Sequence, residues 1–375
     1  MIVNLIVIFL TMFLGILFSK NLSKEANSDW NRKKYISIIC FILILQSGLR
    51  HVATGEDTFN YFNVFEDMKS ATWRSTWEFI CDYYTYGIGK DPGYDVFQKL
   101  ILIVSGSYRF YLFVVAIIFF SALGNFIYKN TTRLVDAVLA FVIYSVLYYS
   151  FYSITGIRQT IATAFTLFSY EFIKKRKFIP FLILILLAST IHKSALVYLP
   201  FYFVVRINSI KYFYGGVLLL FPVLMIYKNE ISILTMLIGG YEAYEKESGA
   251  GTFTFTLMFL SVSLAALLRN KSIMSNNKNA QHYFNAFAII LLFLPLSWIN
   301  PSGMRIVMYF TVFLLLFVPE IIYSLQKISY NVRFYTTITA FIVLIVLYIR
   351  SNLNTPIPYG FFWEKMQLNS HYLYE

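Results

Sequence analysis

The sequence predicts an all-α polytopic integral membrane protein, because of its composition, its apolar segments and the distribution of its basic residues. Hydrophobic residues make up 58% of the 375 residues, charged residues make up 13%, and the mean hydropathy is +0.63. Soluble domains contain about 45–50% apolar and about 25% charged residues. This composition therefore excludes an ordinary soluble domain.

Apolar segments long enough to form helices recur along the whole chain. A membrane-spanning helix needs about 20 mostly apolar residues, and about twelve such segments are predicted. They lie near residues 2–18, 35–49, 108–128, 134–152, 158–173, 178–190, 194–206, 212–228, 252–268, 284–299, 305–325 and 334–350. We therefore expect a single transmembrane domain over residues 1–375.

The basic residues predict the orientation of these helices. Lysine and arginine accumulate in cytoplasmic loops, and they cluster in alternate loops here, for example in residues 19–34 and 174–177. With those loops in the cytoplasm, both termini and the loops 50–107 and 229–251 lie outside. The net charge of +12 is thus explained by topology, and no nucleic-acid partner is expected.

The external loop 50–107 is the longest polar segment of the chain. Residues 93–104 within it are apolar but too short to span a membrane, so they predict a surface or re-entrant helix. The preceding Asp91-Pro92-Gly93 consists of residue types that are common in turns.

One short pattern occurs three times on the predicted outer face. It consists of a hydroxyl residue, a glycine, an apolar residue and an arginine, in Ser47-Gly48-Leu49-Arg50, Thr155-Gly156-Ile157-Arg158 and Ser302-Gly303-Met304-Arg305. The second and third copies begin predicted helices, where unpaired N–H groups and the helix dipole attract anions. Glycine would let a ligand approach the backbone, and arginine binds phosphate with two hydrogen bonds. Arginines at helix ends can instead be interface anchors.

Two residues are candidates for a catalytic base. His192 follows a predicted helix of only 14 residues, so it would lie below the outer membrane surface. Asp57 lies in the long external loop, between Glu56 and Thr58. A histidine at a helix boundary can also be structural, and an aspartate in such a sequence is often a turn former or helix cap.

Several of these residues form a pattern that resembles the EpsG-type branch of the Wzy polysaccharide polymerases. The resemblance rests on Leu49-Arg50 followed by Asp57-Thr58 and Tyr61, on Gly156-Ile157-Arg158-Gln159, and on Ile191-His192-Lys193-Ser194 before Leu199-Pro200. It covers about residues 43–205. It implies a GT-C-like membrane glycosyltransferase architecture with the active site facing the periplasm or cell exterior.

The resemblance implies a transfer of a growing glycan from undecaprenyl diphosphate to a sugar hydroxyl of a lipid-linked repeat unit. The diphosphate would be bound by Arg50, Arg158, Arg305, Lys193 and Tyr61, and the base would be His192 or Asp57. Arginines would provide the positive charge, so no metal and no cofactor are expected. The expected partners are the lipid-linked oligosaccharide and the bilayer, with a chain-length regulator and a flippase as further candidates.

Three other functions fit a polytopic protein of this kind. A polysaccharide transporter or flippase usually has polar sites at the membrane midplane and inverted repeats, and neither feature is evident here. An acyltransferase would need polar residues that reach a donor on the cytoplasmic side. A glycan ligase would differ from a polymerase only in its acceptor.

Overall fold

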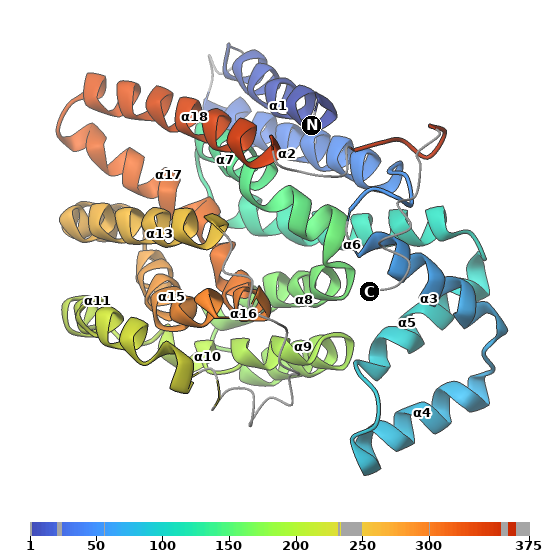
Figure 1. Cartoon of the computed structure of the whole chain (residues 1–375). Coiled ribbons are helices and arrows are strands. Elements are labelled where there is room, and N and C mark those ends of the chain that lie inside the picture. Colours follow the sequence, from blue (N-terminus) through green and yellow to red (C-terminus); the bar gives the residue numbers. More distant parts are fainter. Residues whose placement is uncertain are drawn as a thin grey trace. The chain divides into compact units, whose positions relative to one another are not determined.

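The computed structural model describes residues 2–20, 25–55, 57–231, 233, 250–299, 301–353 and 359–364 (Figure 1). These residues form helices and connecting segments, and a single isolated bridge between Arg50 and Phe361 is the only β-pairing among them. The chain divides into two compact units, one of residues Met1–Leu196 with Ala340–Glu375 and one of residues Val197–Thr339. Most of the predicted loop 229–251 lies outside the described residues.

The first unit contains the N-terminal helices and the end of the last helix. Its elements are α1 (Ile2–Lys20), α2 (Glu25–Gly48), α3 (Thr58–Ser70), α4 (Trp73–Tyr86), α5 (Pro92–Val104), α6 (Tyr108–Asn130), α7 (Leu134–Ile143), the π-helical turns η1 (Tyr144–Tyr148) and η2 (Ser150–Thr155), α8 (Ile157–Lys174) and α9 (Phe178–Ile191). The 3-10 helix η3 (Lys193–Tyr198) crosses the boundary between the units, as does α18 (Tyr330–Asn352).

The second unit is built from shorter and more strongly bent helices. They are α10 (Phe201–Val204), α11 (Ile210–Ile226), α13 (Ala250–Leu268), α14 (Asn270–Asn276), α15 (Ala280–Phe293), η4 (Leu294–Trp298), α16 (Pro301–Thr311), α17 (Leu314–Ser324) and η5 (Leu325–Lys327). Helix α15 is the core of this unit, since it packs against α11, α13 and α16.

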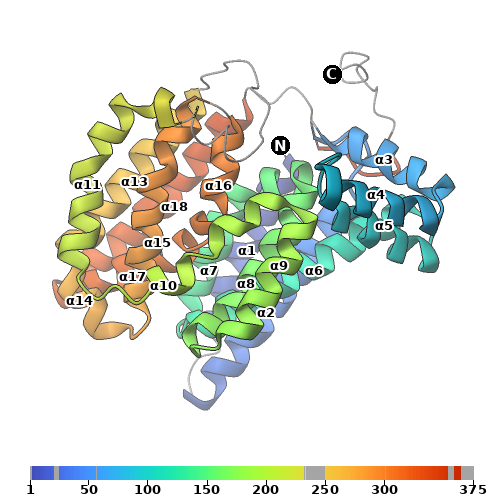
Figure 2. The ribbon, with the colours of Figure 1, turned by 90° about the horizontal axis from the view of Figure 1, so that it is seen from below.

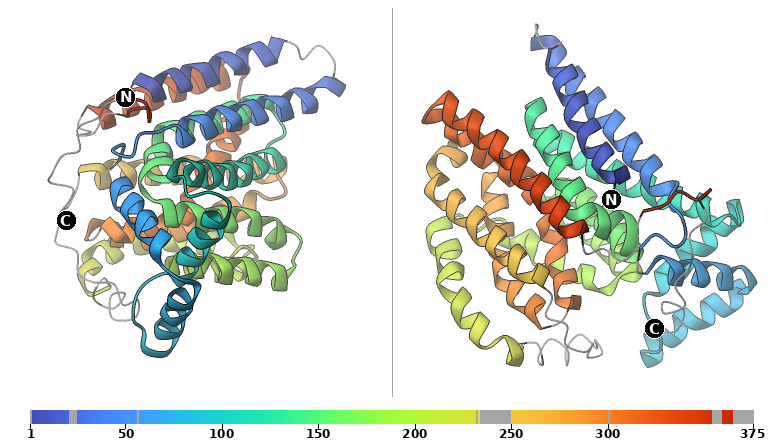
Figure 3. Two further views of the ribbon diagram at one scale, coloured as in Figure 1. Left: turned by 90° about the vertical axis from the view of Figure 1, so that its right-hand side faces the viewer. Right: turned by 45° about the horizontal axis from the view of Figure 1, so that its top comes forward.

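Helices both near and far in the sequence pack together in the first unit. Helices α8 and α9 lie side by side, α2 packs on α6, and α1 packs on α7 (Figures 1 and 3). Helices α3, α4 and α5 lie together at one end of the unit (Figure 2). Three helices therefore occupy the segment 50–107, for which one short helix was predicted.

The predicted helical segments are present, but their number as membrane spans is not confirmed. Four helical segments are long and apolar enough to cross a membrane, namely Ile2–Ser19, Tyr108–Asn130, Ala280–Trp298 and Tyr330–Asn352, and two bent helix pairs raise the number to six. The other apolar helices are short; α9, for example, has 14 residues. The described residues thus support a polytopic membrane protein with four to six candidate spans.

Helix α5, predicted as a surface or re-entrant helix, is buried on one side and exposed on another. Tyr94, Gln98 and Ile101 on one side of it are buried, and Ile101 belongs to the same hydrophobic cluster as Tyr94. The exposed aromatic side chains lie instead on α4, where Trp73 and Trp77 are 50% and 65% exposed. The reason is that α5 packs against α3, α4 and α9 at once.

Arg32 of α2 ties the end of α6 to α2. Its Nη1 atom donates hydrogen bonds to the carbonyl oxygens of Tyr128 (2.7 Å) and Thr131 (2.6 Å), and its guanidinium lies 4.5 Å from the centroid of the Tyr128 ring. The last carbonyls of a helix have no partners within the helix. The buried Arg32 therefore caps α6 from a neighbouring helix.

Replacing Arg32 by alanine is expected to destabilise the protein by roughly 2–3 kcal/mol, because it removes charged hydrogen bonds to buried carbonyls. Lys33→Ala is the matched control, since Lys33 is exposed on the same helix. Thermal unfolding in detergent should show a lower Tm for Arg32→Ala than for Lys33→Ala. Equal Tm values would contradict the capping role.

Candidate functional site

Three segments that are distant in the sequence meet at the carboxylate of Asp91. Arg158 donates a hydrogen bond from Nη1 to Asp91 Oδ2 (3.0 Å), and His192 Nδ1 lies 3.4 Å from the same oxygen. The backbone N–H of Lys193 donates to Asp91 Oδ1 (3.1 Å). Both oxygens of this buried carboxylate are thus engaged, and all of these groups belong to the first unit.

Local sequence explains why Asp91 reaches this position. Asp91 has a φ of 53°, in the left-handed region that aspartate tolerates better than most residues, and Pro92 begins α5. Gly93 allows α5 to approach α9 closely, since a Cβ atom there would lie 2.2 Å from Thr190 Oγ1. This contact brings Asp91 next to the residues that follow α9, His192 and Lys193.

Arg158 is positioned by the beginning of α8, where it is the second residue. The preceding π-helical turns end at Gly156. Thr160 then donates from Oγ1 to the carbonyl oxygens of Tyr152 (2.6 Å) and Gly156 (2.9 Å). This bonding fixes the first turn of α8, whose unpaired N–H groups and dipole favour an anion near Arg158.

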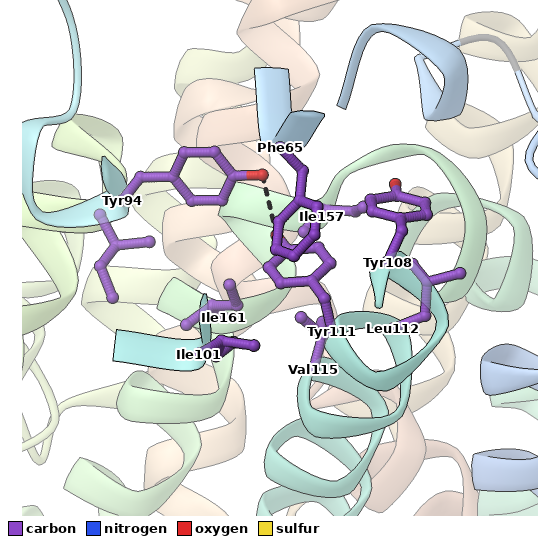
Figure 4. Packing of buried hydrophobic residues seen from close by; sticks show 10 residues of the cluster. Phe65, Tyr94, Ile101, Tyr108, Tyr111, Leu112, Val115, Ile157 and Ile161 are labelled. Carbon is purple, nitrogen blue, oxygen red and sulfur yellow. Dashed lines mark hydrogen bonds between the residues drawn. The ribbon is translucent and has the colours of Figure 1, made fainter. Parts of the chain in front are cut away.

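A cluster of tyrosines lies next to the Arg158 guanidinium. Its Cζ atom is 5.5 Å from the centroid of the Tyr94 ring and 5.7 Å from that of Tyr61, within cation–π range. Tyr94 also shares a hydrogen bond of 2.8 Å with Tyr111 through their hydroxyls (Figure 4). This apolar cluster, which includes Phe65, gives the arginine a rigid support.

The two ring nitrogens of His192 have different surroundings, since only Nδ1 has a partner among the residues that the structure describes. Its side chain is only 13% exposed, and no hydrogen-bond partner of the buried Nε2 atom is found among the described residues. When Nδ1–H donates to a carboxylate, Nε2 carries the lone pair of the neutral ring. The arrangement can therefore accept a proton at Nε2.

The environment shifts the pKa values of Asp91 and Asp95 in opposite directions. Burial would raise the pKa of Asp91, but the His192 hydrogen bond, the His192 and Arg158 charges and the Lys193 N–H lower it below its usual value. Burial raises the pKa of Asp95 to about 6; the Arg158 charge opposes this shift and the Asp91 charge adds to it. Asp91 is thus held ionised, while Asp95 is the more basic carboxylate.

Only some of the residues predicted from the sequence lie together. Arg158, His192 and the backbone of Lys193 contact Asp91, and Tyr61 lies next to Arg158, but the side chain of Lys193 is exposed. Asp57 is the N-cap residue of α3, and no hydrogen bond or ion pair of its carboxylate is found in the described part of the chain. The described contacts therefore link His192 to Arg158 through Asp91 and show no such link for Asp57, so both residues stay predictions.

Arg50 lies in a different environment, at the end of α2. It is 4% exposed and its Nη1 donates to the carbonyl oxygen of Ser47 (2.8 Å). The C-terminal residues pair with the chain on both sides of Arg50, since His51 N donates to Gly360 O (2.8 Å) and Phe362 N donates to Leu49 O (2.9 Å). The Arg50 guanidinium thus completes the end of a helix.

Two glycines of the recurring pattern, Gly48 and Gly303, pack closely against other parts of the protein. A Cβ atom on Gly48 would lie 2.6 Å from the Phe113 ring, and one on Gly303 would lie 2.6 Å from Leu296 O. Ligand approach to the backbone was predicted at the glycines of the second and third copies, Gly156 and Gly303, and this stays a prediction. Arg305 is the fifth residue of α16, beyond its first four N–H groups, and is exposed in the second unit.

Asp91 is the residue that the sequence reading missed. Its side chain makes no cap hydrogen bond to α5, although an aspartate before Pro-Gly is normally read as a turn or cap residue. The sequence feature that could have pointed to Asp91 is Gly93, two residues later, since a glycine at a helix start can indicate close packing of the backbone. In the described residues, no group of three or more His, Cys, Asp or Glu could hold a metal ion.

Comparison with known proteins supports the resemblance seen in the sequence. A model of the EpsG family matches residues 33–361. Neither the curated proteins nor the solved structures give a significant match. The family indicates a polysaccharide polymerase-type function for this membrane protein. Because the match covers most of the chain, this protein belongs to the EpsG family.

Proposed function

We propose that this protein is a membrane glycosyltransferase that polymerises lipid-linked repeat units. It transfers a growing glycan from undecaprenyl diphosphate to a sugar hydroxyl of the next unit, at the outer face of the cytoplasmic membrane. Family membership supports the reaction class. The catalytic roles are proposed for Arg158 and His192 because both residues contact Asp91.

Arg158 is suited to bind the diphosphate. Its side chain is 34% exposed, so part of the guanidinium can reach a substrate phosphate. Arginine binds phosphate through paired hydrogen bonds, and a preorganised positive group stabilises the charge that develops on a leaving diphosphate. Asp91 and the tyrosines hold the guanidinium before the substrate arrives. The exposed Lys193 side chain is a further proposed phosphate contact.

His192 is the proposed base. In the reaction, the acceptor hydroxyl oxygen attacks the anomeric carbon of the growing glycan, and a new carbon–oxygen bond forms there. The bond from that carbon to the diphosphate breaks, and its electron pair leaves with the diphosphate. The hydroxyl proton moves to His192 Nε2, while Asp91 stabilises the resulting positive ring.

The proposed outer location follows from the two ends of α8. Arg158 begins this helix and the basic Lys174 ends it, followed by Lys175, Arg176 and Lys177. The 18-residue α8 is roughly 27 Å long; it is not among the four to six candidate spans by composition, and its crossing of the membrane is part of this proposal. If the basic turn is cytoplasmic, then the Arg158 end faces the other side.

The arginine prediction uses two substitutions. Arg158→Ala should abolish polymer formation, and Arg158→Lys should reduce it at least about tenfold, because an ammonium group cannot form the paired hydrogen bonds. Arg74→Ala is the control, since Arg74 is an exposed arginine of α4. Polymer ladders made by purified protein from a lipid-linked repeat unit provide the measurement. Ladders of normal length in Arg158→Ala would exclude the proposed contact. If the wild-type protein itself forms no ladder, the proposed polymerase function is excluded.

The histidine prediction concerns the chemical step. His192→Gln should lower kcat by about 10²–10⁴-fold, the usual contribution of a general base, with a smaller effect on KM. His51→Gln serves as the imidazole control, since the ring Nδ1 of His51 accepts a turn hydrogen bond from Ala53 N. Initial rates at saturating donor measure the effect. A kcat for His192→Gln equal to that of the control would show that His192 is not the base.

Metal independence is a separate prediction. If arginine supplies the positive charge at the diphosphate, then chelation of divalent cations should change the initial rate less than about twofold. The assay compares purified protein with and without a chelator, followed by added Mg²⁺ or Mn²⁺. Loss of activity with the chelator, and recovery with the metal, would contradict the proposal.

A further inference from the structure

We propose that Asp95 binds hydroxyl groups of the sugar that is attached to the lipid diphosphate. This inference rests on the proposed function, because it places the sugar next to the diphosphate at Arg158. It assigns a carbohydrate-binding role to a residue that the reaction scheme does not use.

The position of Asp95 on α5 supports this role. Asp91 is the N-cap residue of α5, and Asp95 is the fourth residue of that helix, about one turn further along it. The two carboxylates differ in their partners. Asp91 receives hydrogen bonds from Arg158 and from the Lys193 N–H and lies next to His192, whereas Asp95 has no hydrogen-bond or ion-pair partner among the described residues.

The closeness of Asp95 to the proposed phosphate-binding residue, Arg158, also supports this role. It is half-buried, and it lies within electrostatic reach of Arg158 and of Asp91. Burial of a carboxylate without a hydrogen-bond partner is unfavourable, in agreement with its pKa of about 6. A ligand that donates hydrogen bonds would remove this penalty.

The chemistry of the surroundings favours a sugar. A phosphate would be repelled by the carboxylate, whereas sugar hydroxyls are neutral donors that a carboxylate can accept in pairs. Tyr61, also half-buried, contacts Arg158 and offers an aromatic ring to the apolar face of a pyranose. One turn further along α5, the fully buried amide of Gln98 has both its nitrogen and its oxygen without a partner in the described residues. Polar side chains thus continue along α5 beyond the residues that contact Asp91.

Binding of matched probes tests the inference. The probes are farnesyl diphosphate and farnesyl diphosphate linked to glucose, galactose or N-acetylglucosamine, and their Kd values are measured with the full chain in nanodiscs. We expect at least one sugar-linked probe to bind the wild type about tenfold more tightly than farnesyl diphosphate. Asp95→Asn should remove that gain and leave the Kd of farnesyl diphosphate within twofold. Arg158→Ala should weaken the binding of every probe.

Asp82→Asn is the matched control, because Asp82 is an exposed carboxylate on the neighbouring α4; it should change no Kd. Asparagine has the shape of aspartate, and the Tm of Asp95→Asn at pH 7.5 should equal or exceed that of the wild type, because the variant lacks a carboxylate whose ionisation burial disfavours. Three outcomes would overturn the inference: equal wild-type affinity for all probes, an unchanged sugar gain in Asp95→Asn, or an equal loss for all probes in that variant. Failure of the proposed function gives a different result, namely an unchanged diphosphate affinity in Arg158→Ala.

Discussion

The candidate site depends on one buried carboxylate, that of Asp91. A buried charge is stable only when it is paired and hydrogen-bonded, and Asp91 obtains its partners from the start of α8 and from the segment after α9. The same contacts orient the two groups that the proposed reaction uses, a guanidinium and an imidazole. Removal of the carboxylate would therefore leave both Arg158 and His192 without the group that positions them.

The helices could be predicted from the sequence because hydropathy is a local property. Each predicted apolar segment corresponds to one or more helices in the structure, including the short α9. The number of spans could not be predicted in the same way, because it depends on bends. Helices α13 and α14, for example, meet at an angle of 78°, a break that an average over a window of residues does not detect.

The site was only partly predictable, since its contacts join distant residues. Asp91 is 67 residues from Arg158 and 101 residues from His192 in the sequence. Arg158 and His192 could be recognised because each is polar at the end of an apolar segment. Asp91 lies in a polar loop, where an aspartate is ordinary, and only the packing of Gly93 against Thr190 gives it a different role.

The recurring arginine pattern shows why a local motif does not determine a role. Arg50 and Arg158 both follow a glycine by two residues, yet Arg50 completes the end of α2 while Arg158 lies at the start of α8. A helix end presents carbonyl groups and attracts the guanidinium to the protein itself, whereas a helix start presents N–H groups, which leaves the guanidinium to pair with an anion. In the absence of substrate that anion is Asp91. In the proposed reaction a diphosphate would compete with this carboxylate for the same guanidinium, and His192, at the same carboxylate, would be the neighbouring group available to the acceptor hydroxyl.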